Sequence, residues 1–456
     1  MKTQFFRLFA AGFITLLFVY SALAESVALT PVPRPDDWWT KRQAANAEQV
    51  DKGNIDLLMI GDSITHGWDG RGKKVWDSFY GHRKAINMGF SGDRTEHVLW
   101  RLDNLPLDKI SPKAAVLMIG TNNIGHGSST PKETADGIKA IVDKLQKQYP
   151  AMKIIVLNVF SRGNKPDDGM RKKVDEINSY LPKLLKGKEN LTLLDINPVF
   201  LDKDNVLSKD IMPDFLHPNE YGYELWAKAV EPVLTKILEE KNAAVIEADK
   251  MSEGWWKDRH TANVEFINKG SVEFLLIGDS ITHGWDGHPQ LYSKYFGQYK
   301  PVNLGFGGDQ TQHVLWRLNH LPLDKIAPKA AMIMIGTNNS GNPANTPWQI
   351  ADGVRAIVDK LQKQYPQIKI VVLKVFPRDE KPDGHLRFRV NEINLSLPDV
   401  LKGYKNVEIV DINGGFLADD GVLPKDIMPD FLHPNDKGYT IWGDSVAPVL
   451  KEKFGQ

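Results

Sequence analysis

An apolar run that ends in Gly-Asp-Ser occurs twice in the chain, and each copy brings a serine hydroxyl to the point where a strand would end. The first copy, residues 58–68, holds Ser63, and the second, residues 275–285, holds Ser280. A serine hydroxyl becomes an effective nucleophile only when a nearby base takes its proton. The two serines therefore suggest acyl transfer to water, provided that each has a histidine within reach.

A second repeated block, Asp-Phe-Leu-His-Pro-Asn, supplies the histidine. An aspartate three residues before a histidine can reach its Nδ1 within one turn of chain and leave Nε2 free to face the serine. We therefore expect two catalytic triads, which are Ser63, Asp214 and His217 in the first half and Ser280, Asp430 and His433 in the second.

Acyl transfer also needs hydrogen-bond donors where negative charge develops on the substrate oxygen. A Gly-Asp pair follows the second predicted strand of each half, and a glycine there lets a backbone N–H approach a ligand with no Cβ in the way. A Gly-Thr-Asn-Asn block follows the third predicted strand and offers a side-chain amide. The expected oxyanion-hole donors are Gly92 and Asn122, with Gly308 and Asn338 in the repeat, completed by the backbone N–H of each serine.

Other polar residues near these blocks are assigned simpler roles. Arg162 and Arg378 follow the fourth predicted strand of each half, where a site-lining role and a structural role are both open. Four histidines have no second ligand at the spacing of a metal site. We expect them to pack or to hydrogen-bond within loops, and we predict no metal site; they are His66, His97, His283 and His313.

Between the blocks, short apolar runs alternate with stretches that have helical spacing. Apolar runs without polar alternation are typical of parallel strands buried on both faces. The strands expected in the first half are 55–60, 84–88, 114–119, 153–159 and 191–196. The helices expected there are 40–52, 93–102, 133–149, 170–185 and 220–239. This alternation predicts a parallel sheet between two layers of helices, with the functional loops at the carboxyl ends of the strands.

The second half repeats the order of the first, so we expect two similar domains, at 37–240 and 254–456, joined by a fairly stiff linker at 241–253. Basic residues, an apolar run and a small-x-small tripeptide mark residues 1–24 as an export signal, with an uncleaved anchor helix as the alternative. Three prolines predict an extended, poorly packed leader over 25–36.

Composition and the export signal indicate which classes of partner and which compartment to expect. Of 456 residues, 42% are hydrophobic and 25% charged, and 57 Lys and Arg balance 57 Asp and Glu. A chain without net charge has no overall field that attracts nucleic acid or anionic membranes. We therefore expect a small-molecule partner, with no nucleic acid and no stable membrane anchor after signal removal. The signal predicts a periplasmic or extracellular protein, and the absence of Cys means that it folds without disulfides.

The four blocks resemble those of the SGNH (GDSL-type) hydrolase superfamily, named for the Ser, Gly, Asn and His that correspond here to Ser63, Gly92, Asn122 and His217 and their repeats. Residues 303–309, 313–318 and 376–378 are similar to the extended pattern of the platelet-activating-factor acetylhydrolase catalytic subunits. The resemblance implies a three-layer α/β/α fold resembling flavodoxin in each half, no cofactor, and hydrolysis of esters or related acyl bonds. Ser91 departs from that pattern, where the repeat has Gly307.

These observations predict an exported serine esterase with two complete sites that prefers short acyl esters, acetyl esters above all. The loops 124–129 and 340–345 are short and polar, and they provide no contiguous apolar surface for a long acyl chain. The expected substrate is a small ester, including acetylated carbohydrate or lipid. Two alternatives remain open: a carbohydrate-binding module with inactive sites, and a metallophosphoesterase with metal ligands Asp62, His66, Asn122 and His217.

Overall fold

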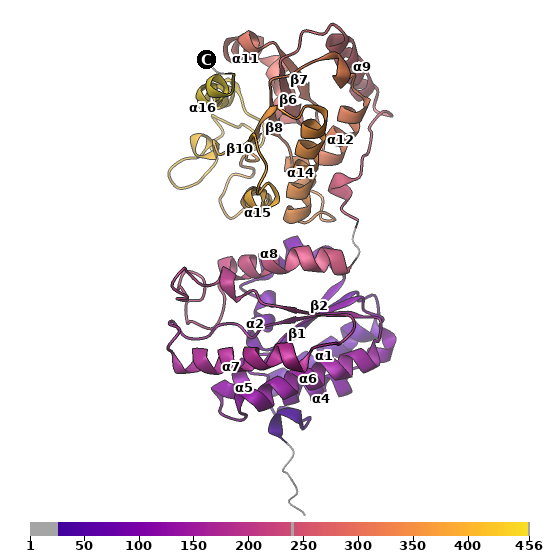
Figure 1. Ribbon diagram of the computed structural model, residues 1–456, viewed down its shortest axis with the longest axis vertical. Coiled ribbons are helices and arrows are strands. Elements are labelled where there is room, and N and C mark those ends of the chain that lie inside the picture. Colours follow the sequence, from indigo (N-terminus) through magenta and orange to yellow (C-terminus); the bar gives the residue numbers. More distant parts are fainter. Residues whose placement is uncertain (1–25, 239–240, 455–456) are drawn as a thin grey trace, which may run out of the picture.

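The computed structural model describes residues 26–238 and 241–454, which we name the first and the second unit; the expected export signal at 1–24 lies outside them. Figure 1 shows the two units stacked along the long axis, each with a central sheet covered by helices. Within the described residues, no helix has both the length and the apolar character needed to cross a bilayer.

The first unit is built on five parallel strands in the order β2-β1-β3-β4-β5. Their bounds are β1 Leu57–Gly61, β2 Ala85–Gly89, β3 Ala114–Met118, β4 Lys153–Leu157 and β5 Leu191–Leu194. All residues of β1 and β3 are buried, because strands covered on both faces send alternate side chains into two cores. The strand order changes direction at β1, which lies between β2 and β3. Loops leaving the sheet there diverge and open a crevice at the carboxyl ends of these strands.

Helices cover both faces of this sheet. The bounds are α1 Asp37–Asp51, α2 Ser63–His66, α3 Lys73–Phe79, α4 Thr95–Asp103, α5 Thr121–Gly125, α6 Pro131–Gln148, α7 Gly169–Leu184 and α8 Glu220–Ile237. Apolar side chains of α1, α4, α6 and α7 pack with Leu58 and Ile60 of β1 on one face. Those of α2, α3 and α8 pack with Leu57 and Met59 on the other face. The alternation along one strand thus holds the three layers together.

The second unit repeats this plan, with parallel strands in the order β10-β9-β8-β6-β7. The strands are β6 Phe274–Gly278, β7 Pro301–Gly305, β8 Ala330–Met334, β9 Lys369–Leu373 and β10 Val407–Val410. The helices are α9 Gly254–Asn268, α10 Ser280–His283, α11 Pro289–Phe296, α12 Thr311–His320, α13 Thr337–Ser340, α14 Pro347–Gln364, α15 His385–Val400 and α16 Asp436–Phe454. The predicted fold class, two tandem α/β/α units with parallel sheets, is confirmed.

The segments expected to be a leader and a linker are both packed against a unit. Ala28 lies in the 3₁₀ turn η1 (Val27–Leu29), is fully buried, and its carbonyl accepts a hydrogen bond from Thr95 Oγ1 at 2.9 Å. Ala244, in η6 (Ala243–Val245), is equally buried and bonds Thr311 Oγ1 at 2.7 Å. Most of the described residues of the expected leader at 25–36 are exposed, and Ala28 is the buried residue that attaches this stretch to the first unit. Prolines favour an extended backbone there, but they do not prevent long-range contacts.

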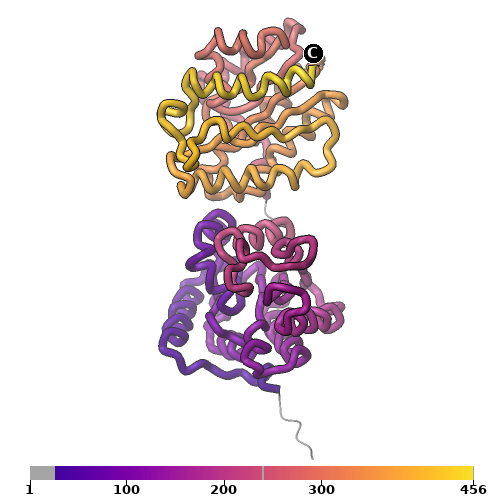
Figure 2. The backbone as a smooth tube through the Cα atoms, turned by 90° about the vertical axis from the view of Figure 1, so that its left-hand side faces the viewer, coloured from indigo at the N-terminus to yellow at the C-terminus, as the bar shows by residue number. Residues whose placement is uncertain are grey.

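The two units meet through α8, which faces α15 across the junction in Figure 1, and Figure 2 shows the same stacking from the side. Lys228 of α8 lies 3.2 Å from the Glu392 carboxylate of α15, and Thr346 Oγ1 donates to Glu231 at 2.8 Å. Phe388 of α15 packs against the apolar core of the first unit. The junction thus combines apolar packing with paired charges.

Candidate active site

The nucleophile candidate Ser63 begins the short helix α2 directly after β1. The Asp62 carboxylate accepts a hydrogen bond from the Ile64 N–H at 2.9 Å and so caps the helix start. Gly61 allows this tight junction, since a Cβ there would lie 2.1 Å from Thr65 Oγ1 and 2.4 Å from the Met118 carbonyl oxygen. Glycine is therefore required between the strand and the helix. Because Gly61 has no side chain, α2 can begin close to β1, and this determines the position of Ser63.

The structure brings Ser63 and His217 together although 154 positions separate them. Ser63 Oγ lies 2.8 Å from His217 Nε2, and His217 Nδ1 lies 2.7 Å from an Asp214 carboxylate oxygen. In the second unit, Ser280 Oγ lies 2.9 Å from His433 Nε2, and the His433 ring lies 2.6 Å from Asp430. Both sets have the hydrogen-bond order of a nucleophile, its base and the group that orients the base.

The turn between Asp214 and His217 explains how a spacing of three works. The second Asp214 oxygen accepts the backbone N–H of His217 at 2.7 Å and of Leu216 at 3.1 Å. Phe215 takes a left-handed conformation with φ 57°, and Phe431 in the repeat has φ 58°. This conformation is uncommon for a bulky residue, and it folds the chain so that carboxylate and imidazole meet. No residue type at this position predicts such a conformation.

The Asp214 carboxylate is held as an anion. Partial burial acts to raise its pKa, but hydrogen bonds from the His217 ring and backbone outweigh burial, and the pKa is lowered from its usual value. The pKa of Asp430 is lowered by the same balance with His433. An anionic partner at Nδ1 favours the tautomer that leaves Nε2 free for the serine.

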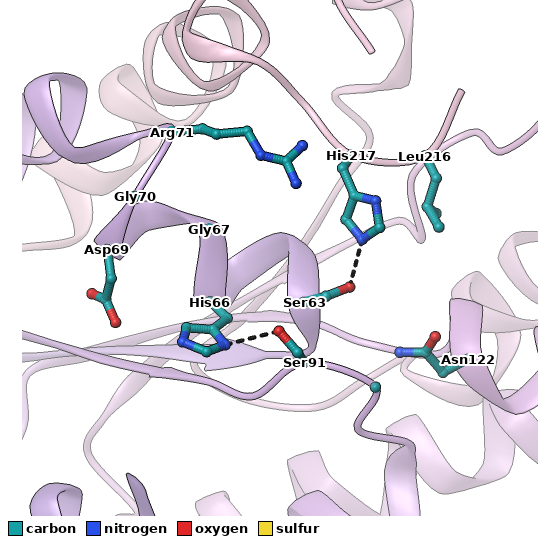
Figure 3. Close-up of a pocket in the computed structure, with 11 residues that line it drawn as sticks. Ser63, His66, Gly67, Asp69, Gly70, Arg71, Ser91, Asn122, Leu216 and His217 are labelled. Atoms are coloured by element: carbon teal, nitrogen blue, oxygen red, sulfur yellow. Dashed lines mark hydrogen bonds between the residues drawn. The ribbon is translucent and has the colours of Figure 1, made fainter. Parts of the chain in front are cut away.

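The expected oxyanion-hole residues lie beside the nucleophile. Gly92 has φ 77°, a conformation that favours glycine, and it lines the same pocket as Ser63 and Asn122. One amide hydrogen of Asn122 bonds the Asp93 carbonyl at 2.9 Å, which fixes the side chain and leaves the other hydrogen available. Figure 3 shows the Asn122 nitrogen on the side of the pocket that holds Ser63 and Ser91. Asn338 is fixed in the same way by Asp309, at 2.9 Å.

The pocket over Ser63 has a volume of about 750 Å³. It is lined by Ser63, His66, Gly67, Asp69, Gly70, Arg71, Ser91, Gly92, Asn122, Leu216 and His217 (Figure 3). Among these described lining residues, Leu216 has the one aliphatic side chain. The pocket therefore has no run of aliphatic side chains along its wall.

A buried ion pair lies directly after Gly92, the expected oxyanion-hole residue, and the sequence analysis did not predict it. Asp93 follows Gly92, is fully buried, and accepts hydrogen bonds from Arg101 Nε and Trp39 Nε1, both at 2.7 Å. Burial raises the pKa of Asp93, and the Arg101 guanidinium opposes that shift. The second unit repeats the trio as Asp309, Arg317 and Trp256. The available signal was that all three residue types recur at corresponding positions in the two halves.

The remaining histidines and arginines near the blocks have structural contacts. His66 Nδ1 lies 2.9 Å from Ser91 Oγ, and burial lowers the pKa of His66. His97 accepts the Arg94 backbone N–H at 3.1 Å. Arg162 donates to the Thr121 carbonyl at 3.2 Å. Of the two roles left open for Arg162 and its repeat, the contacts show the structural one.

Of the four donors considered for a metallophosphoesterase, His66, Asn122 and His217 line one pocket, but Asp62 does not. Asp62 is completely buried, and its carboxyl group accepts the Ile64 N–H. The same burial raises its pKa to about 7. Among the residues that the structure describes, no group of three His, Asp or Glu side chains is placed to hold a metal ion. Ser63 and His217 instead bond one another.

Comparison with known proteins finds two copies of one family. Residues 59–225 and 276–441 each match the model of the GDSL-like Lipase/Acylhydrolase family. The chain is 36% identical over 205 residues to platelet-activating factor acetylhydrolase IB subunit alpha2 of Rattus norvegicus, covering 45% of this chain and 87% of that protein. It is 32% identical over 219 residues to subunit alpha1 of Homo sapiens, covering 47% and 92%.

Solved structures of similar arrangement are more distant in sequence. A putative acylhydrolase from Bacteroides fragilis has 19% identity and a TM-score of 0.39, with 45% of this chain and 100% of that chain covered. The acetylxylan esterase Axe2 from Geobacillus stearothermophilus has 18% identity and a TM-score of 0.34, with 41% and 96% covered.

Proposed function

This chain belongs to the GDSL-like lipase/acylhydrolase family and is a hydrolase acting on esters, and we propose that it cleaves short acyl esters, acetyl esters above all, at one serine in each unit. The observation that carries the proposal is the hydrogen-bonded series from Ser63 through His217 to Asp214, which recurs from Ser280 in the second unit. Two such series in one chain argue that both units have kept the chemistry.

The proposed reaction starts with attack of Ser63 Oγ on the ester carbonyl carbon while His217 Nε2 takes the hydroxyl proton. Negative charge then develops on the carbonyl oxygen, where the N–H groups of Ser63 and Gly92 and the free amide hydrogen of Asn122 donate. The intermediate collapses when His217 gives its proton to the leaving alcohol. Water, deprotonated by the same histidine, cleaves the acyl-enzyme and restores the serine.

The preference for acetyl esters rests on the shape and lining of the pocket. Each buried CH₂ of a longer acyl chain is worth about 0.8 kcal/mol only if it meets an apolar wall, and Leu216 is the one aliphatic side chain among the described lining residues. The acetylhydrolase name of the rat and human relatives is consistent with this preference. Acetylated carbohydrate and lipid alcohols are both within the proposal.

Export is part of the proposal and rests on the sequence of residues 1–24. Fractionation of cells that express the full chain tests it. We expect the processed protein outside the cytoplasm, and a full-length protein confined to the cytoplasm would contradict it.

Labelling with a fluorophosphonate probe, which reacts with activated serines, tests the chemistry. The wild type should take up two probe molecules, Ser63→Ala and Ser280→Ala one each, and the double variant none. Hydrolysis of p-nitrophenyl acetate should persist in each single variant and vanish in the double variant. Ser179→Ala, which removes an exposed hydroxyl on α7, is the matched control. A double variant that still labels and turns over would refute the assignment.

A further inference from the structure

The two units differ in length by one residue in a loop beside the proposed nucleophile. In the first unit, α3 begins after Gly70-Arg71-Gly72, and Trp76 N–H bonds the Gly72 carbonyl at 2.8 Å. In the second, Tyr292 N–H makes the corresponding bond to the His288 carbonyl at 2.9 Å, one residue after Gly287. Gly72 and His288 are therefore equivalent, and Arg71 is the residue that the first unit has in addition.

The loop that carries Arg71 is fixed on both sides. The N–H groups of Gly70 and Gly72 both bond the Gly67 carbonyl, at 3.1 and 3.0 Å. A Cβ on Gly72 would lie 2.6 Å from the Trp68 ring and 2.8 Å from Tyr223, so the backbone is seated directly on these aromatic rings. Because the loop is closed and packed, the direction in which Arg71 leaves the backbone is set before any ligand binds.

Arg71 lines the pocket over Ser63, and Figure 3 shows its guanidinium extending across the pocket toward His217. Among the described residues, the Arg71 side chain makes no hydrogen bond or ion pair. The nearby carboxylate of Asp69 is already paired with Arg42, at 2.8 Å, and accepts from Asn87 at 2.9 Å. Arg71, an exposed residue, is therefore the charged lining residue that has no ion-pair partner among the described residues.

The neighbouring cation Lys74 differs from Arg71 because it forms an ion pair with α8. It lies 3.7 Å from Glu220, the first residue of α8, while in the second unit His288 lies 2.5 Å from Asp436, the first residue of α16. In both units, therefore, an ion pair joins this loop to the helix that follows the proposed catalytic histidine, and Arg71 takes no part in it. His288 also packs on Tyr439 at 4.3 Å, so it is not free to reach a ligand.

We propose that Arg71 makes the first unit selective for esters whose alcohol carries a carboxylate or phosphate group, whereas the second unit takes neutral alcohols. This inference rests on the proposed esterase function. A guanidinium matches both anions with paired hydrogen bonds, and a free guanidinium at a pocket wall is suited to that role. An acetyl group carries no ionisable substituent, so the anionic group must be part of the alcohol.

Three phenyl acetates that differ only in the group at position 4 test the proposal: 4-acetoxybenzoate, 4-acetoxyphenyl phosphate and neutral 4-acetoxybenzamide. The full chain with Ser280→Ala reports on the first unit and the chain with Ser63→Ala on the second. We expect the ratio of kcat/KM for anionic over neutral ester to be higher in the first unit. Arg71→Gln should lower that ratio about tenfold, chiefly through KM, and Arg71→Lys should restore part of it. Two ratios are compared, one for 4-acetoxybenzoate and one for 4-acetoxyphenyl phosphate, each over the neutral ester. The larger of the two shows whether carboxylate or phosphate is the preferred anion.

Lys74→Gln is the matched control, because it removes a cation three residues away that is already paired, and it should leave the ratio unchanged. An equal fall of anionic and neutral turnover in Arg71→Gln, or equal ratios in the two units, would overturn the proposal. If the Ser280→Ala protein hydrolyses none of the three esters, the esterase proposal fails by itself. Calorimetric binding of 4-hydroxybenzoate and 4-hydroxyphenyl phosphate then decides the anion subsite: weaker binding by Arg71→Gln supports it, and equal binding refutes it.

Discussion

Arg101 and Asp93 form an ion pair in which neither side chain is exposed, with Arg101 Nε 2.7 Å from the Asp93 carboxylate. The same Asp93 offers its backbone carbonyl to the proposed oxyanion-hole residue Asn122. The pair therefore joins the stability of the first unit to the position of its catalytic loop. Arg317 and Asp309 repeat it at 2.8 Å in the second unit.

Arg101→Met should destabilise the first unit by about 3–5 kcal/mol, because it leaves the buried Asp93 carboxylate without its partner. Urea unfolding followed by tryptophan fluorescence measures the change. Lys113→Met is the matched control, since Lys113 pairs with Asp56 at the surface with 62% of its side chain exposed, and it should cost less than about 1 kcal/mol. Equal losses in the two variants would contradict this account.

Asn122→Ala in the Ser280→Ala chain should lower kcat about 10²–10³-fold and change KM little, because the amide donates to charge that exists only in the transition state. Steady-state hydrolysis of p-nitrophenyl acetate measures both constants. Asn338→Ala in the Ser63→Ala chain should behave alike. Asn104→Ala, at an exposed position, serves as control. An unchanged kcat would show that Asn122 is only a loop residue.

Asp62→Asn should change how stability depends on pH. Burial raises the pKa of Asp62 to about 7 in the folded chain, while an unfolded aspartate titrates near about 3.9. Between these two pH values the folded state holds a proton on Asp62 that the unfolded state has released. The stabilisation of the folded state by this proton is present at low pH and is lost as the pH rises through about 7. Asparagine keeps the oxygen that accepts the Ile64 N–H but removes the titration.

The free energy of unfolding, measured in urea at several pH values from about 4 to 8, should therefore fall more steeply with pH in the wild type than in Asp62→Asn. One proton limits the difference in slope to about 1.4 kcal/mol per pH unit. Asp51→Asn, at an exposed position of α1, should leave the slope as in the wild type. A wild-type and an Asp62→Asn curve that run parallel would rule out the raised pKa.

Each unit should prefer acetyl over octanoyl esters. Leu216 is the one aliphatic side chain among the described residues that line the first pocket, so added CH₂ groups stay in water and gain little of their roughly 0.8 kcal/mol each. The kcat/KM values of p-nitrophenyl acetate, butyrate and octanoate, measured in the Ser63→Ala and Ser280→Ala chains, should not increase with chain length. A steady rise would point to a lipase with an apolar channel.

Local patterns in the sequence determined the repeated fold and the aspartate partners of His217 and His433. Apolar runs of five to seven residues predicted strands buried on both faces, and the first was expected at 55–60 against Leu57–Gly61 in the structure. Asp214 and His217 are three residues apart, so their contact depends on one turn of chain. The carboxyl ends of parallel strands share one edge, which is why Ser63 and Asn122 were expected in one site.

Contacts between residues distant in sequence were decided only by the tertiary structure. Asp93, Trp39 and Arg101 meet because helices from different parts of the chain pack over the same strand ends, and no local spacing encodes that geometry. The conformation of Phe215, with φ 57°, is imposed by the surrounding chain against the preference of its side chain. Arg71 lines the pocket over Ser63 without a partner among the described residues, while the neighbouring Lys74 pairs with Glu220 of α8. Such a difference between two cations becomes visible only when all their neighbours are in place.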